Sequence, residues 1–200
     1  RRFPSPMAMA RAWARGRRAL STSASRVVEG IRLPGLPQAF DVDIRHPGAT
    51  TALAPEAVTD SVTVLAFHSS GAGGRQWDAG AALAPGARWL APNCMGYAKS
   101  TPWPRDARPP TIDDQGRLLA TALAASEAPA IARGVRVLAH SYGSSVALAT
   151  LEHLAEQGPL RVDSLVFYEP NSFFLLPPAE GAAFQATVDG WLAVKRGHGP

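Results

Sequence analysis

The sequence lacks several features that mark specialised classes of protein. Its 200 residues include one cysteine, Cys94, so no internal disulfide can form, and this cysteine has no metal-ligand partner at a useful spacing. No apolar run is long enough to cross a bilayer. We therefore expect no metal site and no membrane span, and we expect Cys94 to be a small residue in a loop.

Acidic residues are missing from the first 28 residues, which contain seven arginines. The formal net charge of +4 therefore comes from this segment, and the rest of the chain is slightly acidic. A nucleic-acid surface requires basic residues clustered on the folded part of a protein. The sequence has no such cluster after residue 28, so we expect no nucleic-acid partner.

Residues 1–26 have the composition of an organelle transit peptide. Arg11, Arg15 and Arg18 fall on one face of a helix, and a serine-rich stretch follows at 21–25. No long apolar core follows the arginines, which argues against a secretory signal. We expect mitochondrial targeting, with a plastid or the cytoplasm as alternatives for location and a disordered basic tail as the alternative for the segment.

From residue 27 to residue 178 the pattern predicts one α/β domain. Strands at 27–33 and 39–45 are expected to form an antiparallel pair. Further strands are expected at 62–67, 88–91, 134–139 and 163–168, and helices at 76–83, 112–126 and 144–157. This alternation predicts a mostly parallel sheet with helices on both faces. Residues 179–200 are expected to begin a cap or lid helix.

The most informative motif is the run from Ala139 to Gly143, with Ser141 at its centre. It joins a buried strand directly to a helix, which is the setting of a nucleophile elbow. A serine on such a sharp, strained turn projects its hydroxyl clear of the sheet, while small residues on either side let strand and helix approach. The backbone N–H of Tyr142 would then face a developing oxyanion.

A second motif, His68-Ser69-Ser70-Gly71, directly follows the first buried strand. A glycine-rich loop at this place brings backbone N–H groups close to a substrate. Its glycines fit neither of the common nucleotide-binding patterns, so a nucleotide site is a weak alternative. We expect His68 to hold this loop by hydrogen bonds and not to act in catalysis.

Together with the stretch 91–100, these motifs resemble the α/β-hydrolase superfamily, with Asn93 and Ala98 replacing the family's usual aspartate and second glycine. The resemblance implies an esterase-like serine hydrolase with the α/β-hydrolase fold, which acts on a small-molecule acyl substrate through an acyl-enzyme on Ser141. It implies an oxyanion hole formed by the N–H groups of Ser70 and Tyr142, and no cofactor. A serine at the elbow argues against relatives that use aspartate there, such as epoxide hydrolases and haloalkane dehalogenases.

The resemblance also implies an acid and a histidine after the serine, in that order. His153 is expected on a solvated helix face, His198 on a C-terminal tail, and Glu169 as a turn residue before Pro170. We therefore expect the acid and histidine beyond residue 200, which makes the fold incomplete at its C-terminus and the chain a fragment. The alternatives are a non-catalytic protein that binds a ligand or partner, and an acyltransferase or cofactor-free peroxidase. The sequence predicts no oligomeric state.

Overall fold

A computed structural model describes residues 23–49, 62–171 and 179. The N-terminal segment up to residue 22 and the expected cap from residue 180 onward, with His198, lie outside the described residues. Residues 1–170 and 171–200 form two separate units, and the fold below is that of the first unit.

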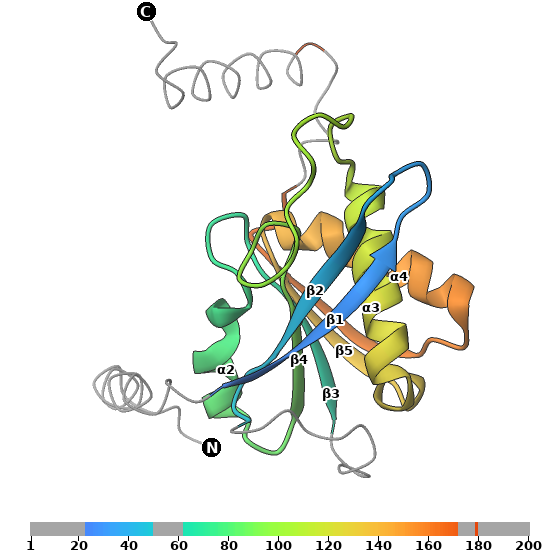
Figure 1. The fold of residues 1–200 in the computed structure, drawn as a ribbon. Coiled ribbons are helices and arrows are strands. Elements are labelled where there is room, and N and C mark those ends of the chain that lie inside the picture. Colours follow the sequence, from blue (N-terminus) through green and yellow to red (C-terminus); the bar gives the residue numbers. More distant parts are fainter. Residues whose placement is uncertain (1–22, 50–61, 172–178, 180–200) are drawn as a thin grey trace, which may run out of the picture. The chain divides into compact units, whose positions relative to one another are not determined.

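The first unit is built on one six-stranded sheet in the order β1-β2-β4-β3-β5-β6 (Figure 1). Its strands are β1 (Ala24–Arg32), β2 (Ala39–His46), β3 (Thr63–Phe67), β4 (Arg88–Pro92), β5 (Val135–His140) and β6 (Val162–Tyr168). The first two strands pair antiparallel, as predicted, and β2 also runs antiparallel to β4. The remaining neighbours pair in parallel, so the prediction of a mostly parallel sheet is confirmed. β1 begins at Ala24, so the last residues assigned to the basic segment belong to the sheet.

Helices cover both faces of the sheet, as predicted (Figure 1). They are the short 3₁₀ helix η1 (Gly74–Trp77), α2 (Asp78–Leu83), α3 (Ile112–Ala132) and α4 (Tyr142–Gln157). The helices α3 and α4 pack on one face and α2 lies on the other. α3 continues to Ala132, beyond its predicted end at residue 126, and α4 begins two residues earlier than predicted. Among the described residues, no helix combines the length and the apolar character needed to cross a membrane.

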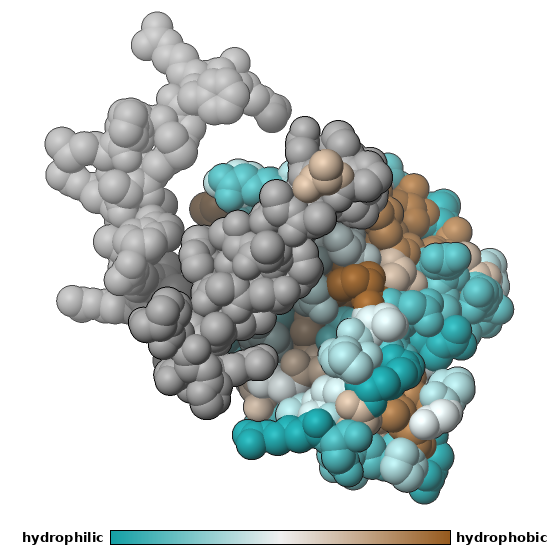
Figure 2. Space-filling model, turned by 90° about the horizontal axis from the view of Figure 1, so that it is seen from above, coloured by the Kyte–Doolittle hydropathy of each residue, from teal (hydrophilic) through white to brown (hydrophobic). Residues whose placement is uncertain are grey.

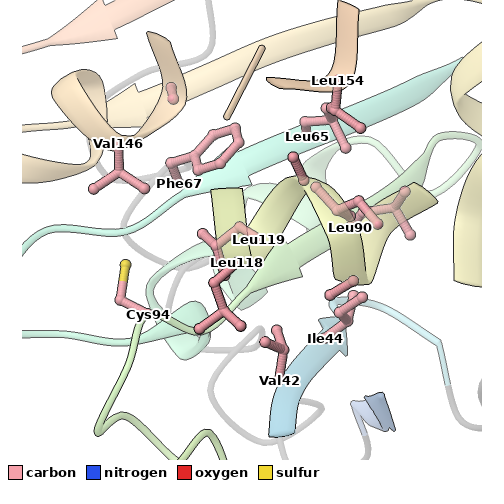
Figure 3. Close-up of a cluster of buried hydrophobic side chains, with 14 of the residues drawn as sticks. Val42, Ile44, Leu65, Phe67, Leu90, Cys94, Leu118, Leu119, Val146 and Leu154 are labelled. Atoms are coloured by element: carbon pink, nitrogen blue, oxygen red, sulfur yellow. The ribbon is translucent and has the colours of Figure 1, made fainter. Parts of the chain in front are cut away.

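The main hydrophobic core lies between the sheet and the pair α3 and α4 (Figure 3). Apolar side chains from the central strands β3 and β4, such as Leu65, Phe67 and Leu90, meet Leu118 and Leu119 of α3 there. All five are 0–1% exposed. Complete burial of a side chain of this size contributes about 1.5–3 kcal/mol. This core is therefore what holds the carboxyl ends of the central strands in place.

The surface of the first unit is mixed in polarity (Figure 2). Brown apolar side chains interrupt the teal polar surface on the part of the molecule that is not grey. On the edge strand β6, Leu165, Val166 and Tyr168 are each about half exposed. The two faces of β6 are therefore less completely covered than those of the central strands.

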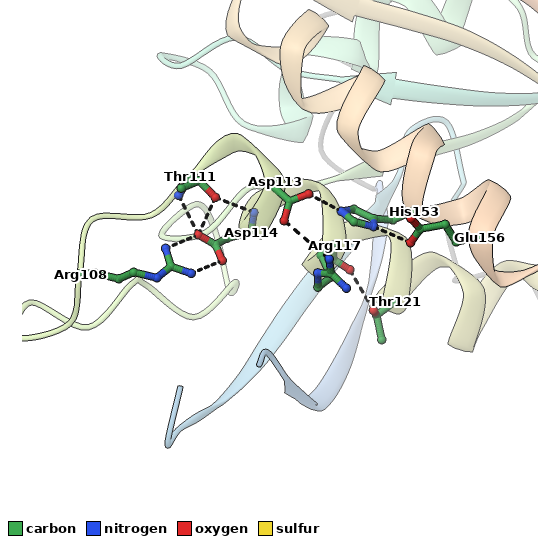
Figure 4. A network of polar contacts seen from close by, with 8 residues as sticks. All are labelled: Arg108, Thr111, Asp113, Asp114, Arg117, Thr121, His153 and Glu156. Atoms are coloured by element: carbon green, nitrogen blue, oxygen red, sulfur yellow. Dashed lines mark hydrogen bonds and ion pairs between the residues drawn. The ribbon is translucent and has the colours of Figure 1, made fainter. Parts of the chain in front are cut away.

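A capping box starts α3, as the sequence pattern at Thr111 and Asp114 indicates. The Thr111 hydroxyl accepts a hydrogen bond from the Asp114 N–H at 3.0 Å, and the Asp114 carboxylate accepts one from the Thr111 N–H at 2.8 Å. Arg108 adds two hydrogen bonds of 2.6 Å to the same carboxylate (Figure 4). The hydrogen bond from Arg108 holds the pKa of Asp114 well below its usual range.

The expectation that His153 lies on a solvated helix face is wrong. Its side chain is 5% exposed and joins α4 to α3 (Figure 4). One ring nitrogen, Nε2, lies 2.7 Å from Asp113 Oδ1, and the other, Nδ1, lies 3.0 Å from Glu156 Oε2. Helical periodicity alone placed His153 beside Glu156, but only the packing of α3 on α4 brings Asp113 to its other side.

We expect the contribution of His153 to the stability of the protein to fall as the pH rises from 6.5 to 8. Burial lowers the pKa of His153, but the hydrogen bonds to Glu156 and Asp113 outweigh burial and raise it. A folded-state pKa above the unfolded value gives stability that is complete below pH 6.5 and is lost as the pH passes the folded-state pKa. Urea unfolding midpoints at both pH values measure this effect.

The matched control for this prediction is His153→Gln, which cannot take up a proton. Between pH 6.5 and pH 8, the midpoint of the wild type should fall relative to that of His153→Gln. An equal change in both proteins would contradict a role for His153 in this dependence.

Candidate active site

The pairing of β3 with β5 brings the two sequence motifs together. Phe67 at the end of β3 is the register partner of Ala139 near the end of β5. The strands are parallel, so the loop that follows β3 and the turn that follows β5 leave the same edge of the sheet. Ser70 and Ser141 therefore lie at neighbouring points on the carboxyl edge, where ligands bind in folds of this kind.

Ser141 occupies the sharp, strained turn that the sequence predicts. Its backbone has φ 52° and ψ −121°, a region that residues with a side chain rarely adopt. The Ser141 N–H donates to the Tyr168 carbonyl at 3.0 Å, and the Ser141 carbonyl accepts from the Ser144 N–H at 2.9 Å. Hydrogen bonds to β6 and to α4 thus hold the strained conformation.

Gly143 explains why the turn needs a small residue after the serine. A Cβ atom at this position would lie 2.6 Å from the carbonyl oxygens of both Phe67 and His68. Only glycine lets the start of α4 pass so close to the end of β3. Ala139, two residues before the serine, is fully buried, and its one methyl group is accommodated.

The N-terminus of α4 points its backbone dipoles toward the turn. Tyr142 is the first residue of α4, directly after Ser141. The N–H groups in the first turn of a helix have no acceptor within the helix, and they carry the positive end of its dipole. The Tyr142 N–H is therefore suited to face a negative oxygen beside Ser141.

The loop after β3 carries Ser70, the other predicted oxyanion donor. Ser70 is exposed, and its carbonyl accepts a hydrogen bond from the Tyr97 hydroxyl. This contact ties the loop to the segment that follows β4. A carbonyl oxygen only accepts hydrogen bonds, so the predicted donor at Ser70 is its backbone N–H.

His68 holds this loop and is buried, as expected. Its Nε2 accepts from the Cys94 N–H at 3.0 Å, so Nδ1 carries the proton and donates to the Ser69 carbonyl at 2.8 Å. Burial lowers the pKa of His68, which keeps the ring neutral. Both nitrogens are occupied, and burial also raises the pKa of the neighbouring Cys94 thiol to about 12. Neither side chain is suited to chemistry on a substrate.

Gln76 links the loop to the elbow, and the sequence motifs do not reveal it. Its Oε1 accepts from the Ser69 N–H at 3.0 Å, so its Nε2 must donate to His140 Nδ1 at 2.8 Å. His140 is the residue before Ser141. The only sign of Gln76 in the sequence is its place at the end of the glycine-rich loop, which does not identify a partner 64 positions away.

Glu169 approaches the elbow from β6 but pairs with His140. Its Oε2 lies 3.6 Å from His140 Nε2, and its carboxylate is 69% exposed. A hydrogen bond with Glu169 also raises the pKa of Tyr168. Like Ser141, Glu169 has a positive φ, here 45°, which fits a tight turn after a strand.

Asn93 and Ala98 are the two departures from the usual family pattern. Asn93 is buried, accepts from the Gly74 N–H at 2.8 Å and donates to Asp43 Oδ2 at 3.0 Å. An aspartate at position 93 would set two carboxylates side by side, so the amide suits this partner. Ala98 has φ 50°, the left-handed conformation that a glycine adopts without strain.

Among residues 23–49 and 62–171, no histidine is hydrogen-bonded to the Ser141 hydroxyl. His68, His140 and His153 have the partners described above, and His46 is buried beside Glu127. The same residues contain no group of three or more side chains that could hold a metal ion. The acid and histidine that the resemblance implies remain predictions.

Comparisons with known proteins agree with this fold. A family model described as the alpha/beta hydrolase fold matches residues 62–196. No match was found among curated proteins.

Solved structures with a similar fold include three hydrolases. A thermophilic esterase from Thermogutta terrifontis is 18% identical, with a TM-score of 0.51 over 72% of this chain and 46% of its own. A hydrolase from Pseudomonas aeruginosa is 21% identical, with a TM-score of 0.52 over 82% of this chain and 52% of its own. The thioesterase domain from the curacin biosynthetic pathway is 20% identical, with a TM-score of 0.51. The match covers 82% of this chain and 52% of that domain's chain.

This chain spans about half the length of these three structures. At these levels of identity the likeness concerns the fold. The family match covers well over half of the chain, including the strand before each motif and the whole of the elbow. The chain therefore belongs to the alpha/beta hydrolase fold family.

Proposed function

We propose that this protein is a serine hydrolase in which Ser141 is the nucleophile toward an ester or related acyl substrate. The observation that carries the proposal is the strained backbone of Ser141, at φ 52° between a buried strand and the start of a helix. Strain of this kind costs roughly 1–3 kcal/mol and is typical of functional sites. It persists here because Gly143 and two backbone hydrogen bonds hold the turn.

In the proposed reaction, Ser141 Oγ attacks the carbonyl carbon of the substrate and its proton passes to a general base. The carbonyl oxygen becomes an oxyanion, which accepts hydrogen bonds from the backbone N–H groups of Ser70 and Tyr142. Collapse of the tetrahedral intermediate releases the alcohol, which takes the proton, and leaves an acyl-enzyme. Water then attacks the acyl-enzyme and restores the serine. The proposed base is a histidine outside the described residues, oriented by an acid.

The positive end of α4 favours this reaction electrostatically. Negative charge appears on the carbonyl oxygen only in the intermediate and in the transition states around it. Donors placed in advance therefore stabilise those states more than they stabilise the bound substrate. No organic cofactor or metal has a part in the proposal.

A fluorophosphonate probe tests the proposal directly, because it phosphonylates activated serines. We expect the full-length protein to be labelled with one-to-one stoichiometry, and mass spectrometry of the digested adduct to locate the label on Ser141. Absence of labelling, with hydrolysis of short-chain esters also absent, would favour the alternative of a non-catalytic binding protein with this fold. A label on another serine would overturn the assignment of Ser141.

A further inference from the structure

Gln76, in the short helix η1, contacts both of the segments that carry the proposed oxyanion donors. Its Oε1 accepts a hydrogen bond from the Ser69 N–H at 3.0 Å, and its Nε2 lies 2.8 Å from His140 Nδ1. Ser69 directly precedes Ser70, and His140 directly precedes the turn at Ser141. One half-buried side chain therefore joins the loop after β3 to the elbow after β5.

The pairing of the two strands ends before it reaches these contacts. The last register pair of β3 and β5 is Phe67 with Ala139. Ser69 and His140 both lie beyond that pair, where the chain has left the ladder. The spacing between the loop and the elbow therefore depends on contacts outside the ladder, and the amide of Gln76 supplies a direct one.

The two contacts of Gln76 also determine which nitrogen of His140 carries a proton. A backbone N–H can donate only to the amide oxygen, so the contact with Ser69 leaves Nε2 of Gln76 facing the imidazole. Because that Nε2 is a donor, His140 Nδ1 must accept and carries no proton. The proton of the imidazole then lies on its Nε2, which is 3.6 Å from Glu169 Oε2. The bridge therefore requires the Nε2–H tautomer of His140.

A separate contact sets the direction of the Ser70 N–H. This group shares a peptide plane with the Ser69 carbonyl, which accepts a hydrogen bond from His68 Nδ1 at 2.8 Å. Because the peptide unit is planar and trans, the N–H points the opposite way from that carbonyl. An oxyanion hole also needs distance, since each donor must lie about 2.7–3.1 Å from the developing negative oxygen. Donors from two different segments must therefore keep a fixed separation.

We propose that Gln76 is a positioning residue for the reaction at Ser141, and that its amide keeps the Ser70 N–H at the distance from the Tyr142 N–H that the oxyanion requires. This inference rests on the proposed function of Ser141. Negative charge appears on the substrate oxygen only after attack begins, so loss of the bridge weakens the transition state more than the bound substrate. Gln76 therefore contributes to kcat and not to KM.

Gln76→Met tests this role, because methionine is also long and unbranched but lacks the amide. In the full-length protein, we expect kcat for hydrolysis of 4-nitrophenyl acetate to fall roughly 10–100-fold, with KM nearly unchanged. Gln157→Met makes the same change at an exposed position at the end of α4 and should keep the wild-type kcat. A wild-type kcat in Gln76→Met, whatever its thermal midpoint, would overturn the proposal.

Gln76→Glu separates loss of the bridge from loss of folding. One carboxylate oxygen can accept from the Ser69 N–H, but the other can accept from His140 only if Nδ1 carries a proton. An imidazolium between the introduced carboxylate and Glu169 meets this condition and leaves the net charge of the group as in the wild type. We therefore expect Gln76→Glu to recover most of the kcat that Gln76→Met loses.

Nitrogen-15 NMR of the imidazole at pH 7 gives a readout that needs no turnover. The His140 signals, assigned by their loss in His140→Asn, should show a proton on Nε2 alone in the wild type and a proton on Nδ1 in Gln76→Glu. A proton on Nδ1 in the wild type would overturn the bridge. If Gln76→Met does not fold, Gln76→Glu decides: a protonated Nδ1 with kcat near the wild type supports the proposal, and a low kcat overturns it.

Failure of this inference can be told from failure of the proposed function. A wild-type kcat in Gln76→Met, with the fluorophosphonate label still on Ser141, would overturn the role of Gln76 alone. A wild-type protein that neither hydrolyses the ester nor takes the label would overturn both, whichever tautomer His140 adopts.

Discussion

Replacement of Ser141 by alanine is expected to abolish fluorophosphonate labelling and to lower kcat for ester hydrolysis by roughly 10⁶-fold. The reason is that the alanine side chain has no oxygen to attack the carbonyl, although the backbone donors at Ser70 and Tyr142 would remain. KM should change much less than kcat, because binding of the substrate does not need the hydroxyl. Steady-state kinetics with a 4-nitrophenyl ester and gel fluorescence with the probe measure both effects.

The matched control is Ser145→Ala, on the first turns of α4, which should keep wild-type labelling. Retained labelling in Ser141→Ala would show that another residue is the nucleophile. A third variant, Ser141→Gly, tests the strain itself. Because glycine adopts φ 52° freely, Ser141→Gly should be about 1 kcal/mol more stable than Ser141→Ala.

Replacement of Glu127 by leucine is expected to destabilise the fold by about 3–5 kcal/mol. Glu127, on α3, is fully buried, and its Oε2 lies 2.5 Å from Arg88 at the start of β4. His46 and Arg26 approach the other carboxylate oxygen at 3.8 and 3.9 Å. Burial, Arg88 and Arg26 lower the pKa of His46 to about 4, so at neutral pH the imidazole is uncharged and the cation nearest to Glu127 is Arg88.

Urea unfolding at pH 7 measures this loss as a lower midpoint. Glu152→Leu, at an exposed position on α4, is the matched control and should lie within about 0.5 kcal/mol of the wild type. The double variant Arg88→Leu, Glu127→Leu should recover much of the loss, because both members of the buried ion pair are then replaced by apolar side chains. A double variant no more stable than Glu127→Leu would show that the cost comes from packing and not from loss of the ion pair.

Much of the fold could be predicted from the sequence, because the patterns that mark strands and helices lie within a few consecutive residues. A nearly continuous apolar run marks β3 as a strand covered on both faces, and the capping box at Thr111 marks the start of α3. The elbow could be located for the same reason. The strand, the serine and the glycine that follows it are contiguous, so the strained turn is encoded within a few residues.

The partners of the site could not be predicted, because each contact joins residues that are distant in sequence. Gln76 meets His140 only because the loop after β3 packs against the end of β5. His153 meets Asp113 only through the packing of α4 on α3, which is why a helical-wheel argument placed it in solvent. Periodicity tells which face of an element is apolar, and it does not tell which element will cover that face.

The sequence by itself determined the α/β architecture, the strained turn at Ser141 and the expectation of a serine nucleophile. These depend on propensity, on apolar patterning and on a contiguous motif. Only the tertiary structure decided that His68 and Cys94 are buried and joined by a hydrogen bond, and that the amide of Asn93 pairs with Asp43. Hydrogen-bond partners and burial depend on how the strands and helices pack, and that packing brings together residues far apart in the chain.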